Sequence, residues 1–126
     1  MKYIKVLKLS WRNMVNNKLL GLLGMAAKAG KLTYGGNLVR TKIQSLKKPN
    51  LVLLSSDSSQ NTKKRITNCC TYYGCCINVV DLSSEEIGHI TGRAGPISCV
   101  AINDEGFATA MEKAIDETST DASKNS

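Results

Sequence analysis

The chain has 126 residues, of which 42% are apolar; this is enough for one packed domain but not for two, and it excludes a disordered polypeptide. Lysine and arginine number 17 against 10 acidic residues, so the net charge is +7, and residues 1–65 contain one acidic side chain, Asp57, beside fourteen basic ones. This asymmetry favours an anionic partner, and nucleic acid over membrane because no long basic amphipathic helix is predicted, although a basic surface that only aids solubility is a competing interpretation.

The ends of the chain differ from its middle in composition. Residues 1–13 are interpreted as an N-terminal extension that is not native to the domain, because Met14 can serve as an internal start. Residues 116–126 are small and polar, so a disordered tail is expected there. The domain is therefore predicted to span residues 14–115.

Two helices are predicted in the first part of this domain. The first runs from Asn17 to Ala29 and ends at Gly30, a residue type favoured after a helix C-terminus. Its apolar face follows helical spacing through Leu19, Leu22, Leu23, Ala26 and Ala27. After a short extended connection, a second helix is predicted from Gly36 to Lys47, because Pro49 prevents continuation. Its expected apolar face consists of Val39, Ile43 and Leu46.

Helices then alternate with apolar runs that suit buried strands. Ser83 and Glu86 have the spacing of a capping box, which predicts the start of a short helix. The predicted order is strand 51–56, helix 58–73, strand 75–82, helix 83–92, loop 93–96, strand 97–103 and helix 104–115. This pattern predicts an α/β domain with a mixed sheet of about four strands and helices on both faces.

The five cysteines are the residues that most resemble a reactive site. Four of them form adjacent pairs in "CCTYYGCC", namely Cys69, Cys70, Cys75 and Cys76. An odd, clustered set indicates reduced thiols and hence a cytoplasmic protein. Because adjacent side chains diverge, both members of a pair seldom reach one metal ion. A thiol-based redox or metal site is therefore the alternative hypothesis, and no metal or other cofactor is predicted.

No convincing catalytic residues are present. His89 is the only histidine, and Glu85 and Glu86 are adjacent, so they diverge on a helix. The stretch "GHITGRAG" lacks the preceding strand that phosphate-binding loops require. The protein is therefore not expected to be an enzyme.

The stretch "YGGN" is a candidate binding site because it opens the second predicted helix. A helix N-terminus exposes unpaired N–H groups and carries partial positive charge. Gly35 and Gly36 would let another backbone approach closely, and the Asn37 amide can donate and accept hydrogen bonds at base edges. Cations for phosphates are available from Lys31, Arg40 and Lys42. A plain structural turn is the competing interpretation.

A second candidate is the loop before the last strand, "RAGPI", from Arg93 through Ala94, Gly95 and Pro96 to Ile97. In an α/β sheet such a loop can lie beside the start of the second helix. One cation, a rigid proline and an apolar side chain could cover an unstacked base. A tight connection between helix and strand is again the alternative.

Several blocks in order resemble the YlxQ-like bacterial branch of the L-seven-Ae ribosomal protein family. They are "NKLLGLLGMAAKAGKLTYGGNLV", "LVLLSSDSSQNTKKRI", "YYGCCINVV", "EEIGHITGRAGPISCVAI" and "DEGF", and the resemblance covers about residues 14–115. It implies a three-layer α-β-α sandwich that recognises kink-turn or kink-turn-like RNA, a sharply bent internal loop with tandem sheared G·A pairs. It also implies that residues 35–37 contact guanines and that residues 93–97 pack on a flipped-out nucleotide.

Two positions depart from the family pattern. The tightest kink-turn binders of the family have Glu after the asparagine and Lys three residues later, where this chain has Leu38 and Thr41. Loss of the Glu removes an acceptor for a guanine edge, and Lys42 or Arg40 could supply the missing cation. Weaker affinity or a somewhat different RNA is therefore expected.

The leading hypothesis is a non-enzymatic, cytoplasmic, monomeric RNA-binding protein that is ribosome-associated and has no membrane partner. The RNA would be ribosomal RNA or a messenger leader that contains a kink-turn. A scaffold that contacts RNA only through charge is a further alternative. The predicted RNA-binding residues are Lys31, Gly35, Gly36, Asn37, Arg40, Thr41, Lys42, Arg93, Ala94, Gly95, Pro96 and Ile97.

Overall fold

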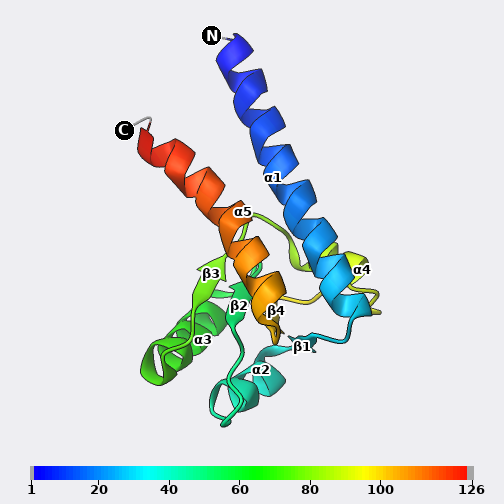
Figure 1. The fold of residues 1–126 in the computed structure, drawn as a ribbon, viewed down its shortest axis with the longest axis vertical. Helices are drawn as coiled ribbons and strands as arrows, with labels where there is room; N and C mark the ends of the chain where they lie inside the picture. Colours follow the sequence, from blue (N-terminus) through cyan, green and yellow to red (C-terminus); the bar gives the residue numbers. More distant parts are fainter. Residues whose placement is uncertain (1, 125–126) are drawn as a thin grey trace.

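The structure, a computed structural model, describes the backbone of residues 2–124 and the side chains of Met14 and residues 16–116. Helices and strands alternate along these residues (Figure 1). Their order is α1 (Lys2–Lys28), β1 (Leu32–Tyr34), α2 (Gly36–Ile43), β2 (Leu51–Leu54), α3 (Gln60–Tyr73), β3 (Ile77–Val79), α4 (Ser84–Ile90), β4 (Cys99–Ile102) and α5 (Glu105–Lys124).

The four strands form one mixed sheet in the order β1-β4-β2-β3. Strand β4 is antiparallel to both β1 and β2, whereas β2 and β3 are parallel. All four residues of β2 and all four of β4 are buried, as their continuous apolar runs predict. The predicted mixed sheet of about four strands is confirmed.

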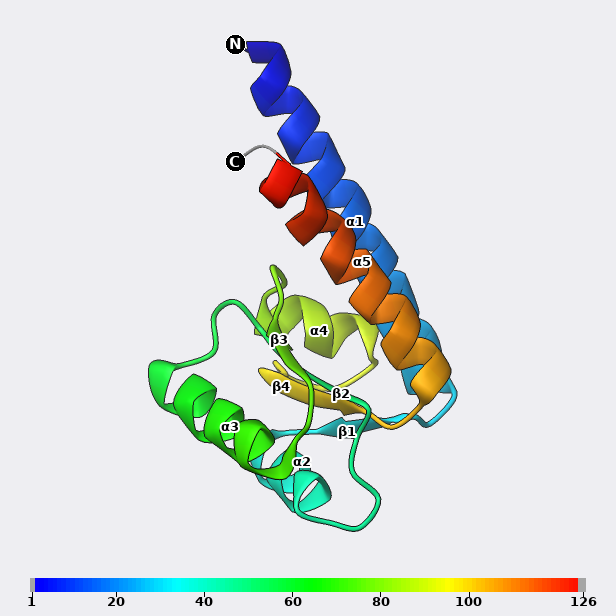
Figure 2. The same ribbon diagram turned by 60° about the vertical axis from the view of Figure 1, so that its left-hand side comes forward.

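The strands supply apolar side chains to two separate cores because alternate residues point to opposite faces. Leu51 and Leu53 of β2 pack with residues of α1, α4 and α5. Val52 and Leu54 pack with residues of α2 and α3. Figure 2 shows the two groups of helices on opposite sides of the sheet. The predicted three-layer α-β-α sandwich is therefore confirmed.

Helix α1 ends where the sequence predicts, because Gly30 adopts a φ of +70°. The Gly30 N–H donates to the carbonyl of Ala27 (3.1 Å) and the Lys31 N–H donates to that of Ala26 (3.0 Å). These two bonds form a Schellman motif, which satisfies carbonyls that the helix end would otherwise leave unpaired.

Both terminal helices are longer than predicted. Helix α1 begins at Lys2, within the predicted extension 1–13, and α5 continues to Lys124, through most of the predicted disordered tail 116–126. Neither segment contains a glycine or proline that would end a helix: none occurs at residues 2–20 or 107–124. Residues 1, 125 and 126 lie outside the described residues, and the domain limits at 14 and 115 stay a prediction.

The two long helices lie side by side and project away from the sheet (Figures 1 and 2). Within residues 2–124, no helix combines the length and apolar character needed to cross a membrane.

Helix α2 is shorter than predicted and ends at Ile43. The Ser45 N–H bonds to the Lys42 carbonyl (3.1 Å), and the Ser45 Oγ lies 2.6 Å from that carbonyl and 3.0 Å from the Lys47 carbonyl. This local side-chain bonding competes with helix continuation. Val39 and Ile43 are buried as predicted, but Leu46 is fully exposed, so its assignment to the apolar face was wrong.

Substitution of a core leucine and of an exposed leucine by alanine should show that burial, and not residue type alone, determines the loss of stability. Leu53 is completely buried, so Leu53→Ala should lower the free energy of unfolding by about 2–5 kcal/mol. Leu46→Ala removes the same atoms from an exposed position and should change it by less than about 0.5 kcal/mol. Chemical denaturation followed by circular dichroism measures both, and equal losses would contradict this assignment of the core.

Candidate nucleic-acid interface

The start of α2 is an uncapped helix N-terminus. Gly35 precedes the helix with φ +88° and ψ 147°, a conformation accessible only to glycine, and the helix start has no side-chain capping hydrogen bond. The Gly35 carbonyl already accepts the Val39 N–H (3.0 Å), as a residue at this position should. Helix geometry leaves the N–H groups of residues 36–38 without intrahelical partners. Together with the helix dipole, they form an electropositive end suited to an anion.

The two glycines of this end face open space. A Cβ atom built at Gly35 or at Gly36 would meet no other atom within 4 Å. The backbone conformation explains glycine at position 35, but Gly36 has neither a positive φ nor a packing neighbour that would require it. The protein's own fold therefore does not use this space, which leaves it available to a bound molecule.

The predicted loop of residues 93–97 is exposed but firmly held on α4. The Arg93 N–H donates to the Gly88 carbonyl and the Ile97 N–H to the Ser84 carbonyl, both at 2.9 Å. Residues 93–96 are exposed and Ile97 is half-buried. Gly88 permits this contact, because a Cβ at that position would overlap the Gly95 carbonyl. The sequence offered no signal for this role of Gly88.

A further contact fastens α4 itself to the end of β2. The Asp57 carboxylate accepts bonds from the N–H (2.9 Å) and the Oγ (3.0 Å) of Ser84, the residue that also holds Ile97. The nearby Ser55 hydroxyl and the Ser84 N–H lower the pKa of Asp57 below its ordinary value. Asp57 therefore remains ionised, and this contact persists, unless the pH falls below its usual titration range. The helix start is also closed by the predicted capping box of Ser83 and Glu86.

Tyr34 joins the loop to the start of α2. The Arg93 guanidinium lies over the Tyr34 ring, 4.4 Å from its centroid, and Tyr34 directly precedes Gly35. The Gly35 N–H donates to the Cys99 carbonyl (3.0 Å), and Tyr34 pairs with Val100 across the sheet. The structure thus brings together residues 35–37 and 93–97, which are almost sixty positions apart. Tyr34 was not among the predicted RNA-binding residues, although an aromatic residue beside a glycine pair could have indicated it.

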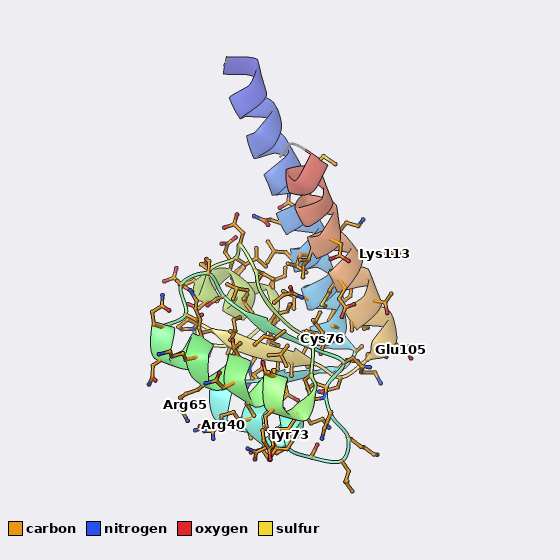
Figure 3. All side chains as sticks on the ribbon, turned by 90° about the vertical axis from the view of Figure 1, so that its left-hand side faces the viewer. Arg40, Arg65, Tyr73, Cys76, Glu105 and Lys113 are labelled. Atoms are coloured by element: carbon orange, nitrogen blue, oxygen red, sulfur yellow. The ribbon has the colours of Figure 1, made fainter. Side chains whose placement is uncertain are left out.

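The predicted cationic residues do not all lie at the start of α2. Lys31 lies at the opposite end of β1, four residues from Gly35 and hence about 13 Å along an extended chain, so it does not join the cluster. Arg40 and Lys42 lie on different faces of α2. Figure 3 shows Arg40 and Arg65 on the side of the sheet that α2 and α3 cover; Arg65 follows Lys63 and Lys64 on α3.

Leu38 and Thr41, the two departures from the family pattern, occupy one face of α2. Leu38 is 64% exposed, and the Thr41 Oγ1 donates to the Asn37 carbonyl (3.0 Å). Both line a groove of about 540 Å3, which we call the α2 groove. Its complete lining is Thr33, Leu38, Thr41, Lys42, Ser45, Leu46 and Lys47.

The cysteines of the alternative hypothesis differ in burial and chemistry. Within the described part of the chain, no three His, Cys, Asp or Glu side chains are placed to hold a metal ion. Cys70 and Cys99 are buried in the core between the sheet and α2 and α3, and this burial raises the pKa of each thiol to about 12. Cys69 and Cys75 are half-buried, and only Cys76 of the two pairs is exposed. His89 is exposed on α4.

Comparison with known proteins identifies the family. Residues 17–112 match the ribosomal protein L7Ae/L30e/S12e/Gadd45 family. The chain belongs to this family. The match covers the open start of α2 and the loop of residues 93–97, and so includes the whole candidate interface.

The relatives confirm the predicted YlxQ-like branch. The chain is 36% identical over 95 residues to the RNA-binding protein YlxQ of Bacillus subtilis (strain 168), which covers 75% of this chain and 92% of that protein. It is 34% identical over 100 residues to the RNA-binding protein YlxQ of Enterococcus faecium, which covers 79% and 92%.

Two solved structures share the fold. A protein of unknown function from Bacillus halodurans C superposes with a TM-score of 0.73 at 32% identity, over 79% of this chain and 97% of that one. A 15.5 kD RNA binding protein from Giardia lamblia superposes with a TM-score of 0.69 at 15% identity, over 85% and 89% of the two chains.

Substitution of Gly88 tests whether close contact with α4 holds the loop. Gly88→Ala forces a methyl group against the Gly95 carbonyl and should lower the free energy of unfolding by about 1–3 kcal/mol. Amide chemical shifts of residues 93–97 should move most. Gly95→Ala places its methyl in open space and should leave both stability and these shifts nearly unchanged. Equal effects of the two substitutions would contradict this account.

The thiols should differ sharply in reactivity. At pH 8 the Cys70 and Cys99 thiols, whose pKa burial raises to about 12, should remain almost entirely protonated and resist iodoacetamide in the folded protein. The exposed Cys76 should be alkylated first. Peptide mass spectrometry after timed labelling measures the order. Denaturant should abolish the difference, and early labelling of Cys70 would contradict its burial.

Proposed function

We propose that the protein binds RNA and recognises a kink-turn or a kink-turn-like bend. One observation carries this proposal: the uncapped, side-chain-free start of α2 lies beside an exposed loop that α4 holds in place. A sharply bent RNA offers both a phosphate backbone that can approach exposed N–H groups and an unstacked base that needs a separate contact surface. The names of the two YlxQ relatives support RNA as the partner.

The two parts of the interface would contribute differently to binding. The N–H groups of residues 36–38 and the exposed Asn37 amide would bond to phosphate or base-edge oxygen and nitrogen atoms. Pro96 and Ile97 would cover a base by apolar contact, while Arg93, positioned by the Tyr34 ring, would meet a phosphate. Lys42, Arg40 and the lysines of α3 would add attraction that is independent of sequence.

The proposed function requires no chemistry on the RNA. The family and the names of the relatives indicate RNA-binding proteins rather than enzymes. We further propose that the protein acts as a cytoplasmic monomer on ribosomal RNA or a messenger leader, in association with the ribosome. A scaffold held on RNA only by charge is the competing function, and the experiment below separates the two.

A charge placed at the α2 start should disrupt recognition without disturbing the fold. Gly36→Glu introduces a carboxylate into open space that the RNA backbone would occupy, so affinity for a kink-turn duplex should fall by about tenfold or more. Gly21→Glu is the matched control, because Gly21 is also open and exposed but lies on α1, across the sheet. It should reduce affinity by much less, and fluorescence anisotropy measures both.

Two further comparisons distinguish specific recognition from attraction by charge. Asn37→Ala should narrow the preference for the kink-turn over a duplex with scrambled G·A pairs, whereas Lys63→Ala should mainly make the salt dependence of binding less steep. If the wild-type protein binds the two duplexes equally, recognition of the bend is contradicted and the scaffold hypothesis is favoured.

A further inference from the structure

The α2 groove lies beside the proposed interface, and of its lining residues the function above uses only Lys42. Leu38 is 64% exposed and Leu46 is fully exposed, and both of these large apolar side chains line the same groove. Exposed apolar surface of this kind, rimmed by polar groups, commonly marks an interaction site. Leu38, Thr41, Lys42 and Ser45 follow helical spacing, so α2 and the turn after it supply one wall and Thr33 of β1 contributes to the other.

The charge of the groove indicates an anionic occupant. Lys42 and Lys47 belong to its lining, and none of the lining residues is acidic. No Asp or Glu occurs anywhere in residues 1–56, so the sequence around the groove supplies no carboxylate to neutralise these lysines. An apolar floor with cations at its rim is the combination that binds a nucleotide, since the base packs on the floor and the phosphate meets a cation.

Bonds within the chain hold the groove in shape. The Ser45 hydroxyl lies within hydrogen-bond distance of both the Lys42 and the Lys47 carbonyls and shares its one proton between them, which holds the turn that carries Leu46. The Lys48 Nζ donates to the Ser45 carbonyl (3.0 Å) and lies 5.2 Å from the Tyr73 ring centroid, which ties the same turn to α3. A preformed surface loses less conformational entropy on binding.

The groove is continuous with the α2 start. Leu38 is the third residue of the helix, directly after Asn37, and helical rise places the end of α2 at Ile43 only about 8 Å further along. An RNA strand that leaves the helix N-terminus on this face would therefore meet Leu38 first and Leu46 afterwards.

From these observations we propose that the α2 groove binds one unpaired nucleotide of the same RNA, with its base against Leu38 and Leu46 and its phosphate at Lys42 or Lys47. This inference rests on the proposed function, because it requires RNA at the start of α2. The nucleotide in the groove is distinct from the one covered by residues 93–97. Apolar contact with the base makes the groove tolerant of base identity but dependent on a base being present.

Abasic RNA provides the test. In the kink-turn duplex, each unpaired nucleotide is replaced in turn by an abasic ribose phosphate, which keeps the charge and removes the base. Wild-type protein, Leu46→Ala and Met25→Ala are titrated against every RNA. Met25 is the matched control, because it is 55% exposed and lies on α1, on the other side of the sheet.

We expect the effects of base removal and of Leu46→Ala on affinity to be non-additive at one unpaired position of the RNA. Loss of one base should weaken wild-type and Met25→Ala binding by about fivefold but should not weaken Leu46→Ala further, because that variant has already lost the contact. Pro96→Ala should show the same non-additivity at a different nucleotide. This would distinguish the base contact at residues 93–97 from the one in the α2 groove.

Two results would overturn the inference while the proposed function stands. Leu46→Ala could bind every RNA as the wild type does, which would leave an acidic protein surface as the remaining occupant of the groove. Alternatively, the variant could lose affinity equally on all RNAs, which would indicate no contact with a particular base. Failure of the proposed function would give a different result: the wild-type protein would not prefer the unmodified kink-turn to its scrambled control.

Discussion

The hydrogen bond from the Gly35 N–H to the Cys99 carbonyl links the three elements on which the interface depends. It joins the end of β1 to the start of β4, at the point where one chain segment turns into α2 and the other arrives from the loop of residues 93–97. Gly35 can make this bond and also begin a helix only because it adopts a positive φ. Glycine has no side chain that could cap the helix, so the first N–H groups of α2 remain open to a ligand.

The candidate interface is accessible to a ligand, and the surrounding fold holds it in place. Residues 93–96, Asn37 and Leu38 are exposed, as binding surfaces must be, whereas Gly35 and Gly36 are half-buried; backbone bonds fix both segments to the fold. Gly88 is central to this support, since its missing side chain allows α4 and the loop to touch through their backbones. Loops positioned in this way by a packed scaffold bind with little loss of conformational entropy.

Much of the fold follows from local sequence patterns. The continuous apolar run at residues 51–54 predicted a buried strand, and Gly30 and the Ser83–Glu86 pair predicted one helix end and one helix start, because each depends on a few neighbouring residues. The start of α1 and the C-terminal ends of α2 and α5 were predicted wrongly for different reasons. Helix α2 stops early where Ser45 competes for its last carbonyls, whereas α1 and α5 continue through segments that composition alone assigned to an extension and a tail.

By itself, the sequence determined the α/β class, the family and the two stretches that could contact RNA, because periodicity, capping residues and ordered motifs are local or linear properties. Only the tertiary structure decided that these stretches meet through Tyr34 and Arg93, that Lys31 stands apart, and that Leu46 faces solvent in a groove with Leu38. Those outcomes depend on strand order and on how closely backbones approach. Both are set by packing between residues far apart in the chain, which no local pattern encodes.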